Sequence, residues 1–154
     1  MKRKDLYMYM DALSNVTELK GVKFAYTLIK NKKKIEEEIK ILEEVVKASE
    51  DFSIYENQRI RLCEIHCEKD DNGKPIILEN KYKILDIQSF DNELNSLKEK
   101  HMSSILERER QINEYNKMLE EDIEINLSKI DFIDIPTDIT TAQLESIEFM
   151  VNFD

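Results

Sequence analysis

The chain has 154 residues, with 33 Asp and Glu against 23 Lys and Arg, so its formal net charge is −10. It contains only two glycines, which disfavours phosphate-binding loops, glycine-rich dinucleotide turns and an all-β sandwich, because these folds depend on positive-φ backbone. The acidity argues against general nucleic-acid binding, since neutralising phosphates requires a surplus of Lys and Arg. With 41% apolar residues, the chain is expected to be a single domain spanning 1–154 with a real core.

The first half of the sequence predicts two helices and a hairpin. Residues 5–17 space their apolar side chains three and four apart, as in a short helix. Residues 22–69 contain neither Gly nor Pro, and their apolar seam shifts midway, which predicts one long helix that changes its buried face. Residues 69–75 carry the strongest turn signal, and the apolar runs on either side of residues 79–81 predict a β-hairpin over 74–86.

The second half predicts another long helix, a strand and a closing helix. Residues 89–122 again contain neither Gly nor Pro and are rich in helix formers. Residues 123–135 begin with alternating apolar and polar side chains, the pattern of a half-buried strand. Thr140 and Gln143 have the spacing of a capping box, which predicts a C-terminal helix over 140–151.

These elements predict an α+β fold that is mainly α. Two long helices separated by about twenty residues most simply fold back into an antiparallel, coiled-coil-like hairpin. A small β-hairpin or sheet and short terminal helices complete it, and the sequence leaves open whether all the strands join one sheet. No apolar run is long enough to span a bilayer, and the basic start lacks the apolar stretch of a signal peptide. We therefore expect a soluble protein of the cytoplasm.

Charge is unevenly distributed along the chain. Residues 1–34 hold nine Lys and Arg against three Asp and Glu, a net charge of +6, whereas the remaining residues carry −16. The basic patch, residues 30–34, could touch nucleic acid or an acidic partner. Pairing of its lysines with the neighbouring glutamates is the simpler interpretation. The acidic segment, from residue 118 onward, could occupy a basic groove of a partner protein that normally holds nucleic acid. Its acidity could equally serve only to keep the protein in solution. The candidate partner-binding residues are therefore Lys30, Lys32, Lys33, Lys34, Glu120, Glu121, Asp122 and Glu124.

One cluster offers soft ligands or a nucleophile. Cys63, His66 and Cys67 would share one helical face, but zinc needs a fourth ligand and no second Cys pair exists. The only other histidine, His101, would not be level with His66 in a simple helical hairpin. Ordinary interior packing is therefore favoured for these residues, and we expect no metal, no cofactor and no enzymatic activity.

Motifs in residues 19–31, 68–74, 82–84, 90–94 and 124–127, together with the closing helix, carry a resemblance to known proteins. They resemble a group of small bacteriophage and prophage proteins of Gram-positive hosts. The resemblance lies in a short leading helix, in the run that opens the first long helix, and in motifs spread through the rest of the chain. One departure is Gly21, which stands where proline is usual in that group. The resemblance implies an origin in a phage or prophage rather than any particular reaction.

Three functions are compatible with these features. The first is a phage inhibitor of a host defence system, such as an anti-CRISPR protein, that acts by stoichiometric contact with a host protein. The second is a virion morphogenesis factor, either an assembly chaperone or a scaffold. The third is a minor enzyme or metal protein centred on the Cys and His cluster. The first is the main prediction, with a CRISPR effector or another nucleic-acid-binding defence protein as partner and with homo-oligomerisation left open.

Overall fold

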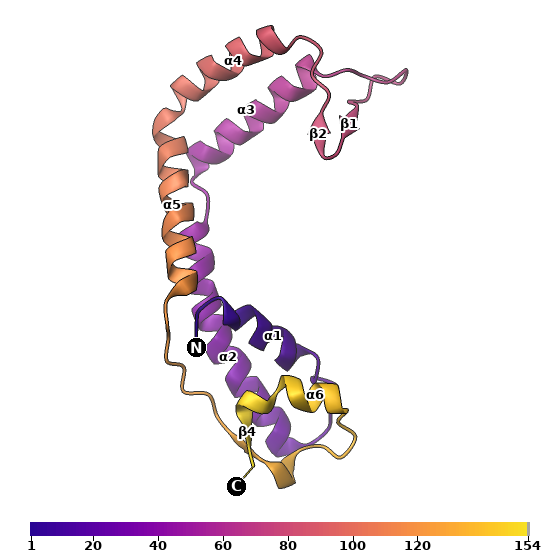
Figure 1. Cartoon of the computed structure of the whole chain (residues 1–154), viewed down its shortest axis with the longest axis vertical. Helices are drawn as coiled ribbons and strands as arrows, with labels where there is room; N and C mark the ends of the chain where they lie inside the picture. The colour runs from indigo at the N-terminus through magenta and orange to yellow at the C-terminus, as the bar shows by residue number, and fades with distance from the viewer. Residues whose placement is uncertain (154) are drawn as a thin grey trace. The chain divides into compact units, whose positions relative to one another are not determined.

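The computed structural model describes residues 1–153, which form two compact units. Unit 1 consists of residues 1–46 and the described part of 113–154, and unit 2 consists of residues 47–112. The predicted class, α+β and mainly α, is confirmed by six α-helices and two small sheets in the described residues (Figure 1). The single domain over 1–154 stays a prediction. No helix within residues 1–153 is both long and apolar enough to cross a lipid bilayer.

Unit 1 is built on α1 (Asp5–Ser14) and α2 (Val22–Val46), which pack against each other (Figure 1). Gly21 precedes α2 with a φ of +153°, and a Cβ there would lie 3.4 Å from the Cβ of Phe24. Glycine therefore permits the tight entry into α2. The core of this unit is a cluster of eleven buried apolar side chains: Leu6, Leu13, Val16, Phe24, Leu28, Ile35, Leu42, Ile130, Ile147, Met150 and Val151.

The strand predicted over 123–135 is much shorter than expected. Only β3 (Ile130–Asp131) forms, and it pairs in parallel with β4 (Val151–Asn152). Residues 123–127 alternate between half-buried and exposed positions as the pattern indicated. However, no strand runs along them, and the Ile123 N–H donates to the carbonyl of Met1 at 2.8 Å. Alternation indicates a half-buried extended segment, whereas a strand also needs a hydrogen-bonding neighbour.

The predicted capping box is confirmed, but its helix is short. The Thr140 hydroxyl accepts from the Gln143 N–H at 3.3 Å, and the Gln143 side chain accepts from the Thr140 N–H at 3.0 Å. The helix, α6 (Thr141–Ser146), ends well before the predicted limit of residue 151. A 3₁₀ turn, η2 (Glu148–Met150), follows and leads into β4. The chain leaves the helix because the backbone must become extended to pair with β3.

Unit 2 contains an antiparallel pair of helices, α3 (Glu50–His66) and α4 (Ile87–Lys100) (Figure 1). The end of α3 meets the start of α4, where His66 lies against Phe90 with ring centroids 5.9 Å apart. At the opposite end, Tyr55 lies 5.9 Å from His101. These contacts confirm that the two histidines are not level with each other.

Both long helices expected from the sequence are interrupted. The helix predicted over 22–69 stops at Val46 and restarts at Glu50, where Ser49 is extended and its hydroxyl accepts from the N–H of Phe52. The helix predicted over 89–122 is also divided, into α4 and α5 (Met102–Glu120). The residue between them, His101, leaves helical geometry with φ −111° and ψ 19°. Neither break carries the Gly or Pro that would have announced it.

The predicted hairpin over 74–86 is present with very short strands. β1 (Ile77–Leu78) and β2 (Lys81–Tyr82) pair antiparallel, and they form a sheet separate from that of β3 and β4. The two turn residues, Glu79 and Asn80, have φ values of 49° and 62°. This is the left-handed geometry of a type I′ turn, which suits the twist of a tight hairpin.

Candidate functional site

The predicted acidic segment is partly neutralised by the amino-terminal residues. Glu120 accepts hydrogen bonds from Lys2 at 2.6 Å and from Lys4 at 2.9 Å, and Arg3 pairs with Glu121 at 2.5 Å. The two lysines hold the pKa of Glu120 down at about 2. Glu120 and Glu121 are therefore already engaged within unit 1.

These ion pairs bring part of the basic amino-terminal segment against part of the acidic carboxyl-terminal segment, so some of the opposite charges at the two ends of the sequence neutralise each other in the fold. A further pair joins Lys23 to Asp134 at 3.0 Å. Asp122 and Glu124 are exposed and have no ion pair within residues 1–153. Partner binding by the acidic segment stays a prediction, and Asp122 adds to the stronger effect of Glu120 in raising the pKa of Lys2.

The predicted basic patch is also partly used within unit 1. Lys34 donates to the carbonyl oxygen of Asn126, and Lys32 donates to the hydroxyl of Ser14 at 3.3 Å. Lys30 and Lys33 are exposed. Two of the four predicted cations thus tie α2 to neighbouring segments, which leaves only two for an acidic partner.

A groove between α1 and α6 in unit 1 was not foreseen from the sequence. It encloses about 490 Å³, and its apolar side includes Met8, which is 61% exposed, together with Tyr9 and Phe149. The rings of Tyr9 and Phe149 pack edge to face with centroids 4.3 Å apart. The side chain of Gln143 fixes α6 to the end of α1 by donating to the Asn15 carbonyl at 3.0 Å. The groove therefore has a wall of two packed aromatic rings, and a hydrogen bond between α6 and the end of α1 holds its two sides together.

The rim of this α1–α6 groove is acidic. Asp11 lies on α1, while Glu145 and Glu148 lie on α6 and η2, and all three side chains are exposed. None of them forms an ion pair with a cation in the described part of the chain, and none of the described lining residues is basic. Three unpaired carboxylates beside an apolar surface suit a ligand that combines positive charge with an apolar stem, as Lys and Arg side chains do.

The sequence indicated only some of the residues that form this groove. The acidic excess after Met118 includes Glu145 and Glu148, and the capping box placed a helix beside them. Nothing in the sequence placed Asp11 opposite them, because residues more than 130 positions apart meet only through the folding of unit 1.

The Cys and His cluster lies at the carboxyl-terminal end of α3, where Cys67 is the residue that follows the helix. Cys63 and Cys67 are buried, and burial raises the pKa of the Cys63 thiol, which makes it a poorer nucleophile. His66 Nε2 lies 3.2 Å from a carboxylate oxygen of Glu93. No group of three or more His, Cys, Asp or Glu side chains in residues 1–153 is placed to hold a metal ion. Of these three residues, His66 contacts α4, through Phe90 and Glu93.

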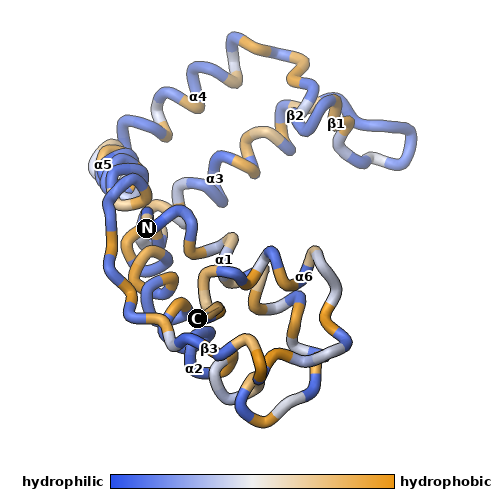
Figure 2. The backbone as a smooth tube through the Cα atoms, turned by 60° about the horizontal axis from the view of Figure 1, so that its bottom comes forward, coloured by the Kyte–Doolittle hydropathy of each residue, from blue (hydrophilic) through white to orange (hydrophobic). Residues whose placement is uncertain are grey.

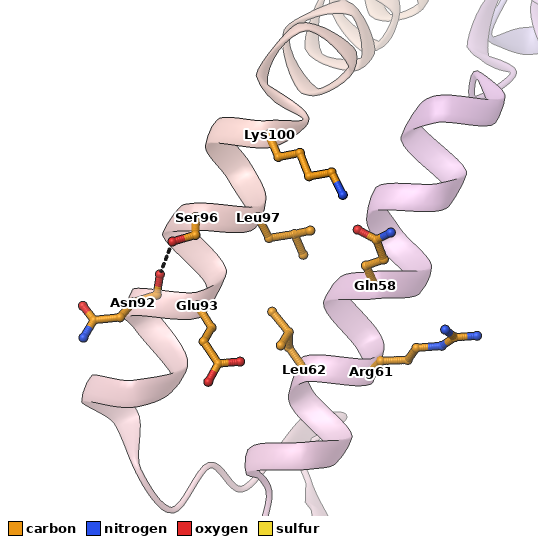
Figure 3. A pocket seen from close by; sticks show the side chains of 8 residues that line it. All are labelled: Gln58, Arg61, Leu62, Asn92, Glu93, Ser96, Leu97 and Lys100. Carbon is orange, nitrogen blue, oxygen red and sulfur yellow. Dashed lines mark hydrogen bonds between the residues drawn. The ribbon is translucent and has the colours of Figure 1, made fainter.

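Unit 2 has its own groove, formed by α3 and α4 and enclosing about 570 Å³ (Figure 3). Leu62 and Leu97 point toward each other in the space between the helices, whereas Arg61 points away from α4. Along α4, Leu97 lies between Glu93 and Lys100. The groove thus has an apolar centre with opposite charges at its two ends.

No family model, no curated protein and no solved structure matches this chain. The resemblance to phage proteins therefore stays a prediction.

Proposed function

We propose that the protein is a non-enzymatic, phage-encoded inhibitor that binds a host defence protein stoichiometrically through the α1–α6 groove of unit 1. Its partner is a nucleic-acid-binding protein, such as a CRISPR effector, and a basic segment of that partner occupies the groove. The observation that carries the proposal is the set of three exposed, unpaired carboxylates around the aromatic wall of Tyr9 and Phe149.

The chemistry of the groove supports a basic protein segment over a nucleic acid or a small anion. Phosphates would be repelled by Asp11, Glu145 and Glu148, whereas Lys or Arg side chains would pair with them. Such cations carry apolar stems that can lie against Met8 and Phe149 while the charged ends reach the rim. Charge complementarity of this kind speeds encounter and selects the partner.

Binding of this kind would inhibit the partner because its basic segment normally holds the phosphates of a nucleic acid. A defence nuclease or its guide-RNA complex holds phosphates with surplus Lys and Arg. A protein that engages the same cations with carboxylates competes for them without any chemical step. Glu124 adds a further exposed carboxylate to unit 1.

Capture from host lysate, followed by identification of the bound proteins, tests this proposal. The wild-type chain is expected to recover a nuclease or guide-RNA effector and to inhibit it at a one-to-one ratio. The triple variant Asp11→Lys, Glu145→Lys and Glu148→Lys should lose this partner. A matched control, Glu36→Lys, Glu37→Lys and Asp138→Lys, changes three other exposed carboxylates of unit 1 and should retain it.

The alternative function, virion morphogenesis, is the other outcome of the same experiment. Recovery of only capsid or tail proteins would support an assembly role and would contradict inhibition of host defence. Equal loss of the partner in the rim and control variants would show that overall charge, rather than the α1–α6 groove, governs binding.

A further inference from the structure

The groove of unit 2 has the layout of one half of a symmetric helical interface. Leu62 on α3 and Leu97 on α4 form its centre, and both are only half buried. Ile54 and Ile65, which are 42% and 66% exposed, continue the apolar surface along α3 on either side of Leu62. Two packed helices with such a face correspond to half of a four-helix bundle.

The charges on α4 would be complementary to those on α4 of a second, antiparallel copy of the chain. Glu93 and Lys100 are seven residues apart and therefore lie on the same helical face about 10 Å from each other, with Leu97 between them. If a second hairpin is laid face to face and antiparallel on the first, Glu93 of each copy lies opposite Lys100 of the other. The same two-fold axis passes near Leu97, so the apolar centres of the two copies meet.

We infer that the α3–α4 groove binds a second copy of this chain and forms a two-fold symmetric four-helix bundle. Symmetric interfaces are self-complementary, because the same patch supplies both sides. An unrelated helix would fit only if it carried an acid near Lys100, a base near Glu93 and an apolar residue between them, whereas a second copy meets all three conditions at once.

The expected association is weak. The shared face of α3 and α4 is about 20 Å long and about 20 Å wide, so two copies would cover roughly 800 Å² in projection. Interfaces near this size lie at the lower limit for specific contacts and are characteristic of transient complexes. We therefore expect a dimer that forms in the micromolar range and dissociates on dilution.

A charge-swap experiment tests the inference by sedimentation of the full chain from about 1 to 300 μM, a range that covers micromolar dissociation constants. The wild type should shift from monomer to dimer. Glu93→Lys alone and Lys100→Glu alone should each weaken the dimer at least about tenfold, because like charges then face each other. Mixing the two variants should restore it, since every facing pair in the mixed dimer is again opposite in sign.

The matched controls are Glu99→Lys and Lys98→Glu, which make the same charge changes on exposed positions of α4 outside the groove. Both should dimerise like the wild type. Because each swapped chain is compared alone and in mixture, a folding defect caused by losing the contact between Glu93 and His66 would prevent rescue rather than imitate it. Circular dichroism of each swapped chain identifies such a defect, and the double variant Glu93→Lys, Lys100→Glu, with both charges exchanged, should dimerise.

A wild type that stays monomeric throughout the concentration range would overturn the inference, as would single swaps without effect or well-folded variants that mixing fails to rescue. The inference is independent of the proposed function. A protein that dimerises but captures no defence protein would refute only the latter, and a monomeric protein that still captures one would refute only the dimer.

Discussion

Unit 1 and unit 2 use similar helical patterns but differ in what they bury. In unit 1, eleven apolar side chains from α1, α2 and the carboxyl-terminal segments form one core. In unit 2, the buried apolar residues are Tyr55, Cys63 and Cys67, and α4 has no buried residue. Hydrophobic and hydrophilic positions alternate along the backbone of α4 (Figure 2). The difference teaches that apolar periodicity yields a core only where a third layer covers two packed helices; two helices alone leave much of their apolar surface exposed.

The largest expected effect comes from truncating the core of unit 1. Phe24 is fully buried, so Phe24→Ala should reduce the free energy of unfolding by about 3–5 kcal/mol. Leu62→Ala in unit 2 removes a half-buried side chain and should cost about 1 kcal/mol, because less apolar surface returns to water. Urea denaturation followed by circular dichroism measures both. Equal losses would remove the distinction between the two units.

A polar contact inside unit 1 should have the next largest effect. Asn31 is fully buried; its amide donates to the Ser128 carbonyl at 2.9 Å and its oxygen accepts from the Ser128 N–H at 2.8 Å. Asn31→Leu should cost about 2–3 kcal/mol, because the Ser128 backbone groups lose their partner. Asn113→Leu, at an exposed position, is the control and should change stability little. An unaffected Asn31→Leu would mean that the Ser128 backbone finds water instead.

The turn of unit 2 offers a stabilising change. Glu79 and Asn80 both have positive φ, and an Asn-Gly pair suits a type I′ turn better than Glu-Asn. Glu79→Asn combined with Asn80→Gly should therefore stabilise unit 2 by about 0.5–1 kcal/mol, because relief of the left-handed backbone outweighs the freedom that glycine adds to the unfolded chain. Asn57→Gly at an exposed position of α3 should instead destabilise it. Thermal unfolding distinguishes the two signs, and a destabilised turn variant would contradict the assigned geometry.

The smallest expected effect belongs to the ion pairs of Glu120 in unit 1. Because Lys2 and Lys4 lower its pKa from 4.5 to about 2 in the folded chain, the pairing stabilises the fold above about pH 4.5. This contribution is lost as the pH falls toward 2. Carbon-detected NMR titration of Glu120 should report the low pKa in the wild type. In the Lys2→Ala, Lys4→Ala variant the pKa should return toward its usual range, and an ordinary pKa in the wild type would exclude the pairing.

Sequence patterns predicted the features whose structure depends on residues close together in the chain. The capping box at Thr140 and the hairpin around Glu79 depend on local chemistry, and both are present. The helix breaks at Ser49 and His101 were not predicted, because serine and histidine are tolerated inside helices and neither break contains Gly or Pro.

The candidate site depended on contacts between distant segments. The sequence indicated an acidic carboxyl-terminal region but not that Lys2 and Lys4 would engage Glu120. It gave no indication that Asp11 would face Glu145 across a groove. A charge map along the chain therefore locates the acidic residues but does not distinguish paired from unpaired carboxylates, which only the tertiary structure separates.

Native-state hydrogen exchange tests the contrast between the two units most directly. At low micromolar concentration, where a weak dimer is dissociated, amides of α1 and α2 in unit 1 should exchange only through global unfolding. Amides of α3 and α4 in unit 2 should exchange at least about tenfold faster through local opening, because little buried apolar surface opposes it. Equal protection of α2 and of the α3–α4 pair under these conditions would contradict the account.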